Sequence, residues 1–491
     1  MPSRRSLISS VPYLLSTTIT SLSSESSTEE DSLAIRLWND CRLESLYALY
    51  SPFVVSLAAG NLDTETYAQY IFQDIAYGKT AVTVSEKAEN DTDDPDAKAI
   101  FAMFKEGDQS GVESSQAWLD EHRPDADSDY VVNDATKYYQ QFLIDTVNGI
   151  VEGHDEQFTG PIVSVFTLAA MIPCWKLYFF IGKQVVASIG DYYKNPYRDW
   201  IDGNSDDSLG EEIKTIESVL NKLAASLGLT SEQLDIVEEV YRKGMKCEIQ
   251  FFHAQPFFQQ TSVPVIGQLS KTGERLLILS NYDGTANVVD SSAVLADLAV
   301  SSKAEMKAKW SHLFAQYKEE YEQEVDLISN SVKTEFSYDA VVQALEPFSG
   351  IEVELTDVNV HANQLGFEGS VTTGEIIGKV VSPQDKVDTF DEILKTTNGD
   401  NDTKTLAVYV GESVEDLLCL LKANIGIVIG SSSSLKRVAT QLGVTFKPLF
   451  AASIDKQVDN IGSWTGLTGT LYTVSSWSEI NTFVLGWQKK L

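Results

Sequence analysis

The chain has 491 residues, of which 43% are hydrophobic, and a formal net charge of −34. This length predicts about two or three domains, and the composition is typical of a folded protein rather than a disordered one. So acidic a chain excludes nucleic acid and anionic membrane surfaces as general partners. No apolar run reaches the ~18 residues that a membrane helix needs, and the least polar stretch, Val163–Ile172, has the length of a core segment. The cysteines form no CxxC pair, so we expect free thiols and no zinc site.

Residues 1–30 are predicted to be a leader that precedes the folded domains. Residues 1–24 contain no acidic residue, two arginines and many serines and threonines. Such acid-poor leaders are typical of transit peptides for mitochondria and other organelles. A disordered tail on a cytosolic protein has the same composition, so both locations stay open.

Residues 31–258 are predicted to form an all-α domain. Apolar residues recur there at spacings of three and four, and no strand-like alternation interrupts them. Gly60, Pro196 and Gly228 stand between the helical stretches, as helix-ending residues do. The predicted helices cover 33–59, 64–88, 96–107, 131–151, 161–189, 209–226 and 230–258.

The rest of the chain changes its pattern. Residues 259–273 are polar, with proline and glycine, and are predicted to be a linker. In 274–491, short runs rich in apolar and β-branched residues alternate with helical stretches, which favours a mostly parallel sheet in an α/β domain. The clearest predicted strands are 276–279, 406–410 and 425–429.

A set of reactive side chains surrounds Cys174 in the helical part. A lone buried cysteine is usually only a small hydrophobic residue, but Tyr178 lies one turn further along the same predicted helix face. Asp74 and Tyr77 share another helix face, at i and i+3. Glu248 interrupts an apolar and aromatic stretch, where a buried carboxylate needs a reason.

Residues 33–258 contain several short motifs: Ser51-Pro52-Phe53-Val54, Gly60-x-Leu62, Tyr70-x-x-Gln73-Asp74, Pro173-Cys174 and Tyr197-x-x-Trp200-Ile201. Together they resemble motifs of the TenA family, also called thiaminase II or aminopyrimidine aminohydrolases. The resemblance implies a helical bundle of the haem-oxygenase type, assembled as a homo-oligomer, which acts on a small pyrimidine or thiamin-derived substrate without a cofactor.

The same resemblance implies a role for each residue. Cys174 is the nucleophile that adds to the pyrimidine ring, and Glu248 is the general acid and base. Asp74 binds the amino group and a ring nitrogen of the pyrimidine. The aromatic walls of the pocket are Tyr77, Tyr138 and Tyr178.

Two residues bear on how far this resemblance extends. Asn204 stands four residues after Trp200, where the family usually has a tyrosine, so the substrate preference is expected to differ. A di-iron site is not favoured, because Glu248 and His253 are five residues apart instead of the i, i+3 spacing that such a site uses.

The segment Asn281–Thr285 follows an apolar run and resembles the first motif of haloacid-dehalogenase-like (HAD) phosphatases, Asp-x-Asp-x-Thr. In that family the first aspartate is the nucleophile, and the second, here Asp283, is the acid and base. Asn281 is an amide and cannot accept a phosphoryl group, so Asn281, Asp283 and Thr285 are expected to be remnants of such a site.

Three more residues complete this second site. Lys386 suits the lysine that steadies the phosphorylated aspartate in HAD phosphatases. Glu412 and Asp416 resemble the acidic metal-binding motif, and oxygen ligands suit a hard cation. The resemblance therefore implies a Mg²⁺ site formed by Asp283, Glu412 and Asp416.

Nearly the whole chain resembles plant bifunctional proteins that join a TenA domain to a thiamin monophosphate phosphatase. Those proteins carry a helical cap and a further strand between the equivalents of Leu345 and Val360, where this chain has only the fourteen residues 346–359. Thr356 is the candidate for the missing motif's hydroxyl. A parallel sheet that lacks a strand leaves backbone groups unpaired, so we expect a shortened domain with weak or absent phosphatase activity.

The sequence thus predicts a thiamin-salvage enzyme that hydrolyses aminopyrimidines in its helical domain. One alternative is a pyrimidine-binding protein whose C-terminal domain is regulatory and non-catalytic. Another is a phosphatase that persists by using Asp283 or Asp290 as its nucleophile.

Overall fold

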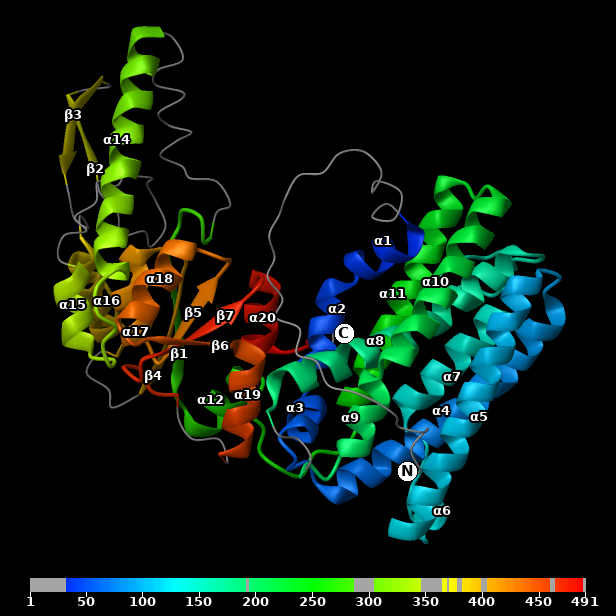
Figure 1. The fold of residues 1–491 in the computed structure, drawn as a ribbon. Coiled ribbons are helices and arrows are strands. Elements are labelled where there is room, and N and C mark those ends of the chain that lie inside the picture. The colour runs from blue at the N-terminus through cyan, green and yellow to red at the C-terminus, as the bar shows by residue number, and fades with distance from the viewer. Residues whose placement is uncertain are drawn as a thin grey trace. The chain divides into compact units, whose positions relative to one another are not determined.

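The computed structural model describes residues 32–190, 194–286, 304–345, 364–368, 371–377, 382–398, 404–459 and 464–488. The chain divides into two compact units that meet in the sequence at Pro264 and Val265. The first unit also takes in Ile454–Ile461 and Gly486–Leu491. Figure 1 labels the elements of both units, and each unit is described here by itself.

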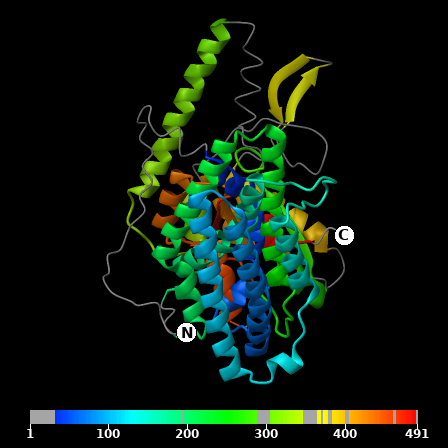
Figure 2. The same ribbon diagram turned by 90° about the vertical axis from the view of Figure 1, so that its right-hand side faces the viewer.

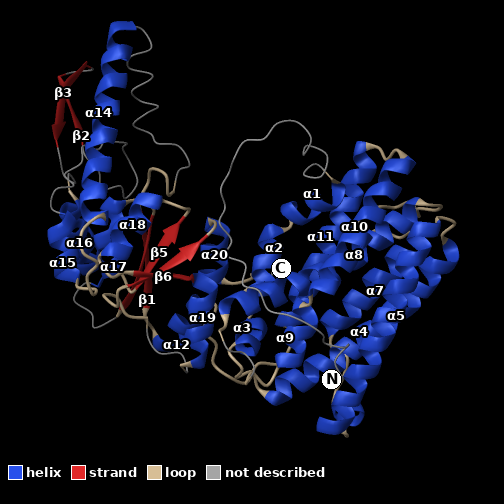
Figure 3. Ribbon diagram, viewed as in Figure 1, coloured by secondary structure: helices blue, strands red, loops and turns tan. Residues whose placement is uncertain are grey.

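The first unit is helical throughout its described residues, as predicted, and all described strands fall in the second unit (Figure 3). Helix boundaries follow local signals: Ser51 caps the helix that begins at Pro52, and Gly228 ends another in the left-handed conformation. The helices are α1 (Leu33–Asp40), α2 (Arg42–Leu49), α3 (Pro52–Ala58), α4 (Thr64–Asp91), α5 (Pro95–His122), α6 (Ala126–Asp129), α7 (Asp134–Val147), α8 (Ile162–Ser188), α9 (Arg198–Ser205), α10 (Asp207–Leu227) and α11 (Ser231–His253).

Helix α8 runs through the core of this unit. By length and composition it is apolar enough to cross a membrane, but 61% of its most apolar window is buried inside the protein. A Cβ atom at Gly244 of α11 would lie 2.9 Å from Pro173 Cγ of α8. The missing side chain therefore lets α11 approach α8 closely, one residue before Cys174.

Helices α4 and α5 lie side by side, as Figure 2 shows. Their contact is close at Gly78, where a Cβ atom would lie 2.6 Å from Val112 Cγ2. Helix α5 also meets α8, because a Cβ atom at Gly107 would lie 2.9 Å from Trp175 Cη2. Small residues thus bring α5 next to the turns of α4 and α8 that carry Tyr77 and Cys174.

The second unit is an α/β domain. It begins with α12, which lies inside the predicted linker 259–273. Its helices are α12 (Val265–Thr272), α14 (Ala304–Ser329), α15 (Tyr338–Leu345), α16 (Pro383–Asn398), η1 (Val414–Asp416), α17 (Leu417–Lys422), α18 (Ser433–Gln441), α19 (Leu449–Val458) and α20 (Trp477–Leu485). Its strands are β1 (Arg275–Ser280), β2 (Gln364–Glu368), β3 (Val371–Ile377), β4 (Thr405–Gly411), β5 (Ile425–Ile429), β6 (Thr445–Pro448) and β7 (Thr470–Val474).

The predicted parallel sheet is confirmed. Five strands pair in the order β1-β4-β5-β7-β6, and every pairing is parallel, while β2 and β3 form a separate antiparallel pair. The central strands β4 and β5 are buried almost completely, as continuous apolar runs in parallel sheets are.

Strand β1 lies at the edge of this sheet. Among the described residues it pairs only with β4, and Ile278 in its middle is 42% exposed. The predicted motif residues Asp290 and Thr356 lie outside the described residues.

Candidate functional site

The helices of the first unit bring a thiol, a carboxyl group and two phenols into contact. Glu248 of α11 is 2% exposed, and its Oε1 accepts a hydrogen bond of 2.7 Å from the Tyr139 hydroxyl of α7. The ring centroids of Tyr139 and Tyr77 are 4.6 Å apart. Tyr77 and Glu248 both act on the Cys174 thiol and shift its pKa. The predicted nucleophile and acid/base therefore lie next to each other.

Burial sets the protonation of these groups. It raises the pKa of Glu248 to about 7, even though hydrogen bonds from Tyr139 and Cys174 act in the opposite direction. Burial likewise raises the pKa of Asp74 to about 7. It also holds the pKa of the Cys174 thiol well above its usual value, and the nearby charges of Glu248 and Asp108 add to this shift. The thiol is thus neutral at pH 7 and needs a base to become a nucleophile.

Tyr178 joins the aromatic side of this region. It accepts a hydrogen bond of 3.3 Å from the Tyr70 hydroxyl, which in turn accepts one of 3.2 Å from Trp200 Nε1. The Tyr178 ring lies 5.4 Å from that of Phe252. Asn204, at the position of the missing tyrosine, donates to the backbone oxygen of Trp200 and so adds no phenol here.

Tyr138 does not lie with these residues, and its predicted place in the pocket wall is wrong. It is 43% exposed, and its hydroxyl donates to Glu152 at 3.2 Å. Tyr139, which is 1% exposed, contacts Glu248 instead. The buried face of α7 carries Tyr139, Phe142 and Thr146. Tyr139 lies three residues before Phe142 and therefore on the same helix face, whereas Tyr138 lies outside that face.

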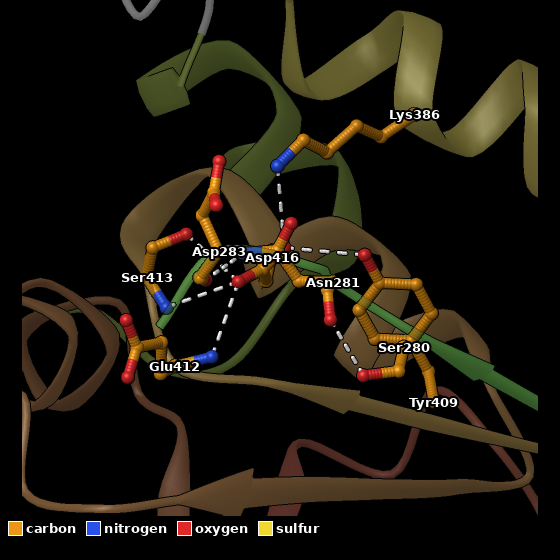
Figure 4. Close-up of polar contacts among 8 residues, drawn as sticks. All are labelled: Ser280, Asn281, Asp283, Lys386, Tyr409, Glu412, Ser413 and Asp416. Carbon is orange, nitrogen blue, oxygen red and sulfur yellow. Dashed lines mark hydrogen bonds and ion pairs between the residues drawn. The ribbon is translucent and has the colours of Figure 1, made fainter. Parts of the chain in front are cut away.

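Asp416 is a buried carboxylate of the second unit that accepts several hydrogen bonds. It is fully buried, and its Oδ1 accepts from Lys386 Nζ at 3.3 Å and from the Tyr409 hydroxyl at 3.1 Å (Figure 4). Its Oδ2 accepts from the backbone N–H of Glu412 at 3.1 Å, and from the N–H and the hydroxyl of Ser413 at 3.0 and 2.8 Å. Burial alone would raise the pKa of Asp416, but Lys386 and these hydrogen bonds outweigh it and hold the pKa below its usual value.

Both oxygens of Asp416 accept hydrogen bonds from the protein, so the carboxylate positions Lys386 and the 412–413 turn. The described residues contain no group of three or more His, Cys, Asp or Glu side chains placed to hold a metal ion. The Mg²⁺ site predicted at Asp283, Glu412 and Asp416 stays a prediction.

Asn281 lies at the end of β1, beside this cluster. Its N–H donates to Val410 O at 3.0 Å, and its side-chain amide donates to Asp283 O at 3.1 Å. The next turn needs Gly284, whose φ is +68° and where a Cβ atom would lie 1.7 Å from Glu412 Oε1. Thr285 is 5% exposed and its hydroxyl has no hydrogen-bond partner among the described residues. The predicted motif residues Asn281, Asp283 and Thr285 thus lie close together, with the Asn281 amide in the place of the nucleophile.

Comparisons with known proteins place the chain in a family. No family model matches it. It is similar to the bifunctional TH2 protein, mitochondrial, of Arabidopsis thaliana, with 35% identity over 562 aligned positions, 94% of this chain and 90% of that protein. Because 562 − 491 = 71, the relative has at least 71 positions without a counterpart here.

Solved structures similar to the chain include a TenA homologue from Pyrococcus furiosus, with 18% identity and a TM-score of 0.38. The match covers 46% of this chain and 100% of that one. A TenA family transcription regulator from Silicibacter has 18% identity, 46% and 98% coverage and a TM-score of 0.39. The identity to the plant protein extends over both units of the chain. The chain belongs to the family of the bifunctional TH2 protein.

Proposed function

We propose that the chain is an enzyme of thiamin metabolism whose helical unit hydrolyses aminopyrimidines. The substrate class is 4-amino-5-aminomethyl-2-methylpyrimidine and thiamin-derived relatives, and the products are the hydroxymethylpyrimidine and an amine. The observation that carries the proposal is the contact between Cys174 and Glu248, with the pKa of Glu248 at about 7. Membership of the TH2 family and the TenA-like motifs around these residues support it.

The chemistry follows from the state of these two groups. Ionised Glu248 takes the proton of the Cys174 thiol, and the thiolate adds to a carbon of the pyrimidine ring. Glu248 then gives that proton to the departing amine. Water adds at the methylene carbon and loses a proton to Glu248, and the carbon–sulfur bond breaks to restore the thiol. Asp74 binds the pyrimidine meanwhile, and Tyr77 and Tyr178 border it.

The test is product release by the full chain from the aminomethylpyrimidine. We expect hydroxymethylpyrimidine and ammonia in equal amounts, measured by chromatography and by an ammonia assay. The affinity for the pyrimidine is measured in parallel by calorimetry. Binding without either product would contradict hydrolysis and favour a pyrimidine-binding protein instead. Neither binding nor product would sink the proposal as a whole.

Tyr139→Phe is expected to lower kcat about tenfold, because it removes a hydrogen bond to a charged group, and to move the pH profile. Glu248 must be ionised to take the thiol proton, so activity falls as the pH drops below its pKa. The Tyr139 hydrogen bond lowers that pKa, so its loss raises the pKa and shifts the acid limb to higher pH. Tyr138→Phe, at the exposed neighbour, is the matched control and should leave kcat/KM and the limb in place. Equal effects of the two variants would contradict the assigned roles.

For the second unit we propose a HAD-like domain related to thiamin monophosphate phosphatases, with weak or absent activity. Asn281 in the nucleophile position supports this. A non-catalytic, regulatory role is the alternative that the same observation favours.

We also propose organellar import and self-association. The relative's name places it in mitochondria, and the acid-poor leader of this chain suits import, although residues 1–31 lie outside the described residues. Self-association through the helical unit is proposed from the TenA resemblance alone.

A further inference from the structure

A further carboxyl group, which sequence patterns did not single out, lies beside the Cys174 site. Asp108 belongs to α5 and directly follows Gly107. Gly107 packs against Trp175, the residue after Cys174. The backbone oxygen of Asp108 would lie 4.0 Å from a Cβ atom built at Gly78, the residue after Tyr77. The two close helix contacts therefore hold Asp108 between the turn of α4 that carries Tyr77 and the turn of α8 that carries Cys174.

The side chain of Asp108 is not satisfied by the protein. Its Oδ2 atom is buried and has no hydrogen-bond partner among the described residues. A buried polar atom without a partner costs free energy, so such an atom needs an explanation. Burial, followed by the charge of Asp74, raises the pKa of Asp108 to about 8. Its charge in turn bears on both Tyr77 and Cys174, which places the carboxyl group at the site.

We infer that Asp108 is a substrate contact whose unpaired carboxyl oxygen hydrogen-bonds a nitrogen of the bound aminopyrimidine. This inference rests on the proposed function, and it adds a specificity-determining residue to it. An aminopyrimidine presents hydrogen-bond acceptors at its ring nitrogens and donors at its amino group. A neutral carboxylic acid both donates and accepts, so Asp108 matches that edge as Asp74 does from α4.

If Asp108 had a purely structural role, its removal would affect stability and ligand binding differently. A group that holds helices together by hydrogen bonds lowers stability when it is removed. An unpaired buried carboxyl group does not stabilise the unliganded fold, so its removal should weaken ligand binding without lowering the melting temperature. Ligand affinity and melting temperature therefore distinguish the two roles.

The experiment measures the affinity of the full chain for the product, 4-amino-5-hydroxymethyl-2-methylpyrimidine, by calorimetry. Asp108→Ala should raise the dissociation constant about tenfold, the effect of losing one hydrogen bond in a buried site. Asp108→Asn keeps the size and one donor and one acceptor, and should stay within about threefold of the unsubstituted chain. Asp120→Asn, at the exposed end of the same helix, is the matched control and should change nothing.

The outcomes separate this inference from the proposed function. Asp108→Ala that binds as tightly as the unsubstituted chain overturns the contact, and so does weaker binding in which both Asp108 variants also melt at lower temperature. An unsubstituted chain that binds no pyrimidine overturns the proposed function together with this contact. Binding that depends on Asp108 in a chain without turnover supports the contact and rejects only the hydrolysis.

Discussion

Cys174→Ala is expected to lower kcat/KM for the aminomethylpyrimidine by about three powers of ten or more, because it removes the atom that forms the covalent bond. Glu248 and Asp74 remain in the variant, so the pyrimidine still binds, but no thiol is left for Glu248 to activate. Binding of the hydroxymethylpyrimidine by calorimetry should stay within about threefold, which shows that the site has not collapsed. The expected signature is therefore a loss in kcat at nearly constant affinity.

Cys247→Ala is the matched control for this experiment. Cys247 precedes Glu248 on α11 and is 1% exposed, so its replacement makes the same chemical change at a buried thiol next to the acid/base. It is expected to keep activity within a few fold of the unsubstituted chain. Should Cys174→Ala retain more than about a tenth of the activity, Glu248 would have to activate water directly and the thiol would not be the nucleophile.

Much of the first site could be predicted from sequence because its residues lie on regular helices. The i, i+3 spacing of Asp74 and Tyr77 and the buried position of Glu248 follow from helical period and apolar context. Tyr139 was missed because two tyrosines are adjacent and the resemblance pointed to the first of them, Tyr138. Asp108 was missed because it stands in a polar stretch, Lys105–Ser110, where a carboxylate usually faces water. The close helix contacts at Gly78 and Gly107 place it beside the site, with its Oδ2 atom buried.

The second site shows what spacing alone does not determine. Glu412 and Asp416 have the i, i+4 spacing that brings side chains together on a helix. In the structure, Ser413 caps the short helix η1, and Asp416 turns back to accept from the 412–413 backbone. A capping contact of this kind depends on turn geometry, so the sequence supported a metal ligand equally well. The strands were predicted better, because β4 and β5 are continuous apolar runs.

Asn281→Asp is expected to raise phosphate release from thiamin monophosphate by about a hundredfold or more over the unsubstituted chain. A carboxylate can attack phosphorus and form an acyl phosphate, whereas an amide cannot. The backbone of residue 281 is held by Val410 O through its N–H, which does not depend on the side chain. Lys386, held by Asp416 nearby, supplies a positive charge for the phosphorylated product. The substitution therefore restores the missing carboxylate and keeps the backbone contact to Val410, and it gives up only the amide's hydrogen bond to Asp283 O.

Phosphate release is measured with the full chain in a magnesium-containing buffer, and Asn281→Ala serves as the control. The alanine variant also loses the side-chain bond to Asp283 O but gains no carboxylate, so it should remain as inactive as the unsubstituted chain. Release by the unsubstituted chain that disappears in Asp283→Asn would contradict the prediction and make Asp283 the nucleophile. If Asn281→Asp stays inactive, the defect lies beyond residue 281, and the shortened stretch 346–359 is where the phosphatase was lost.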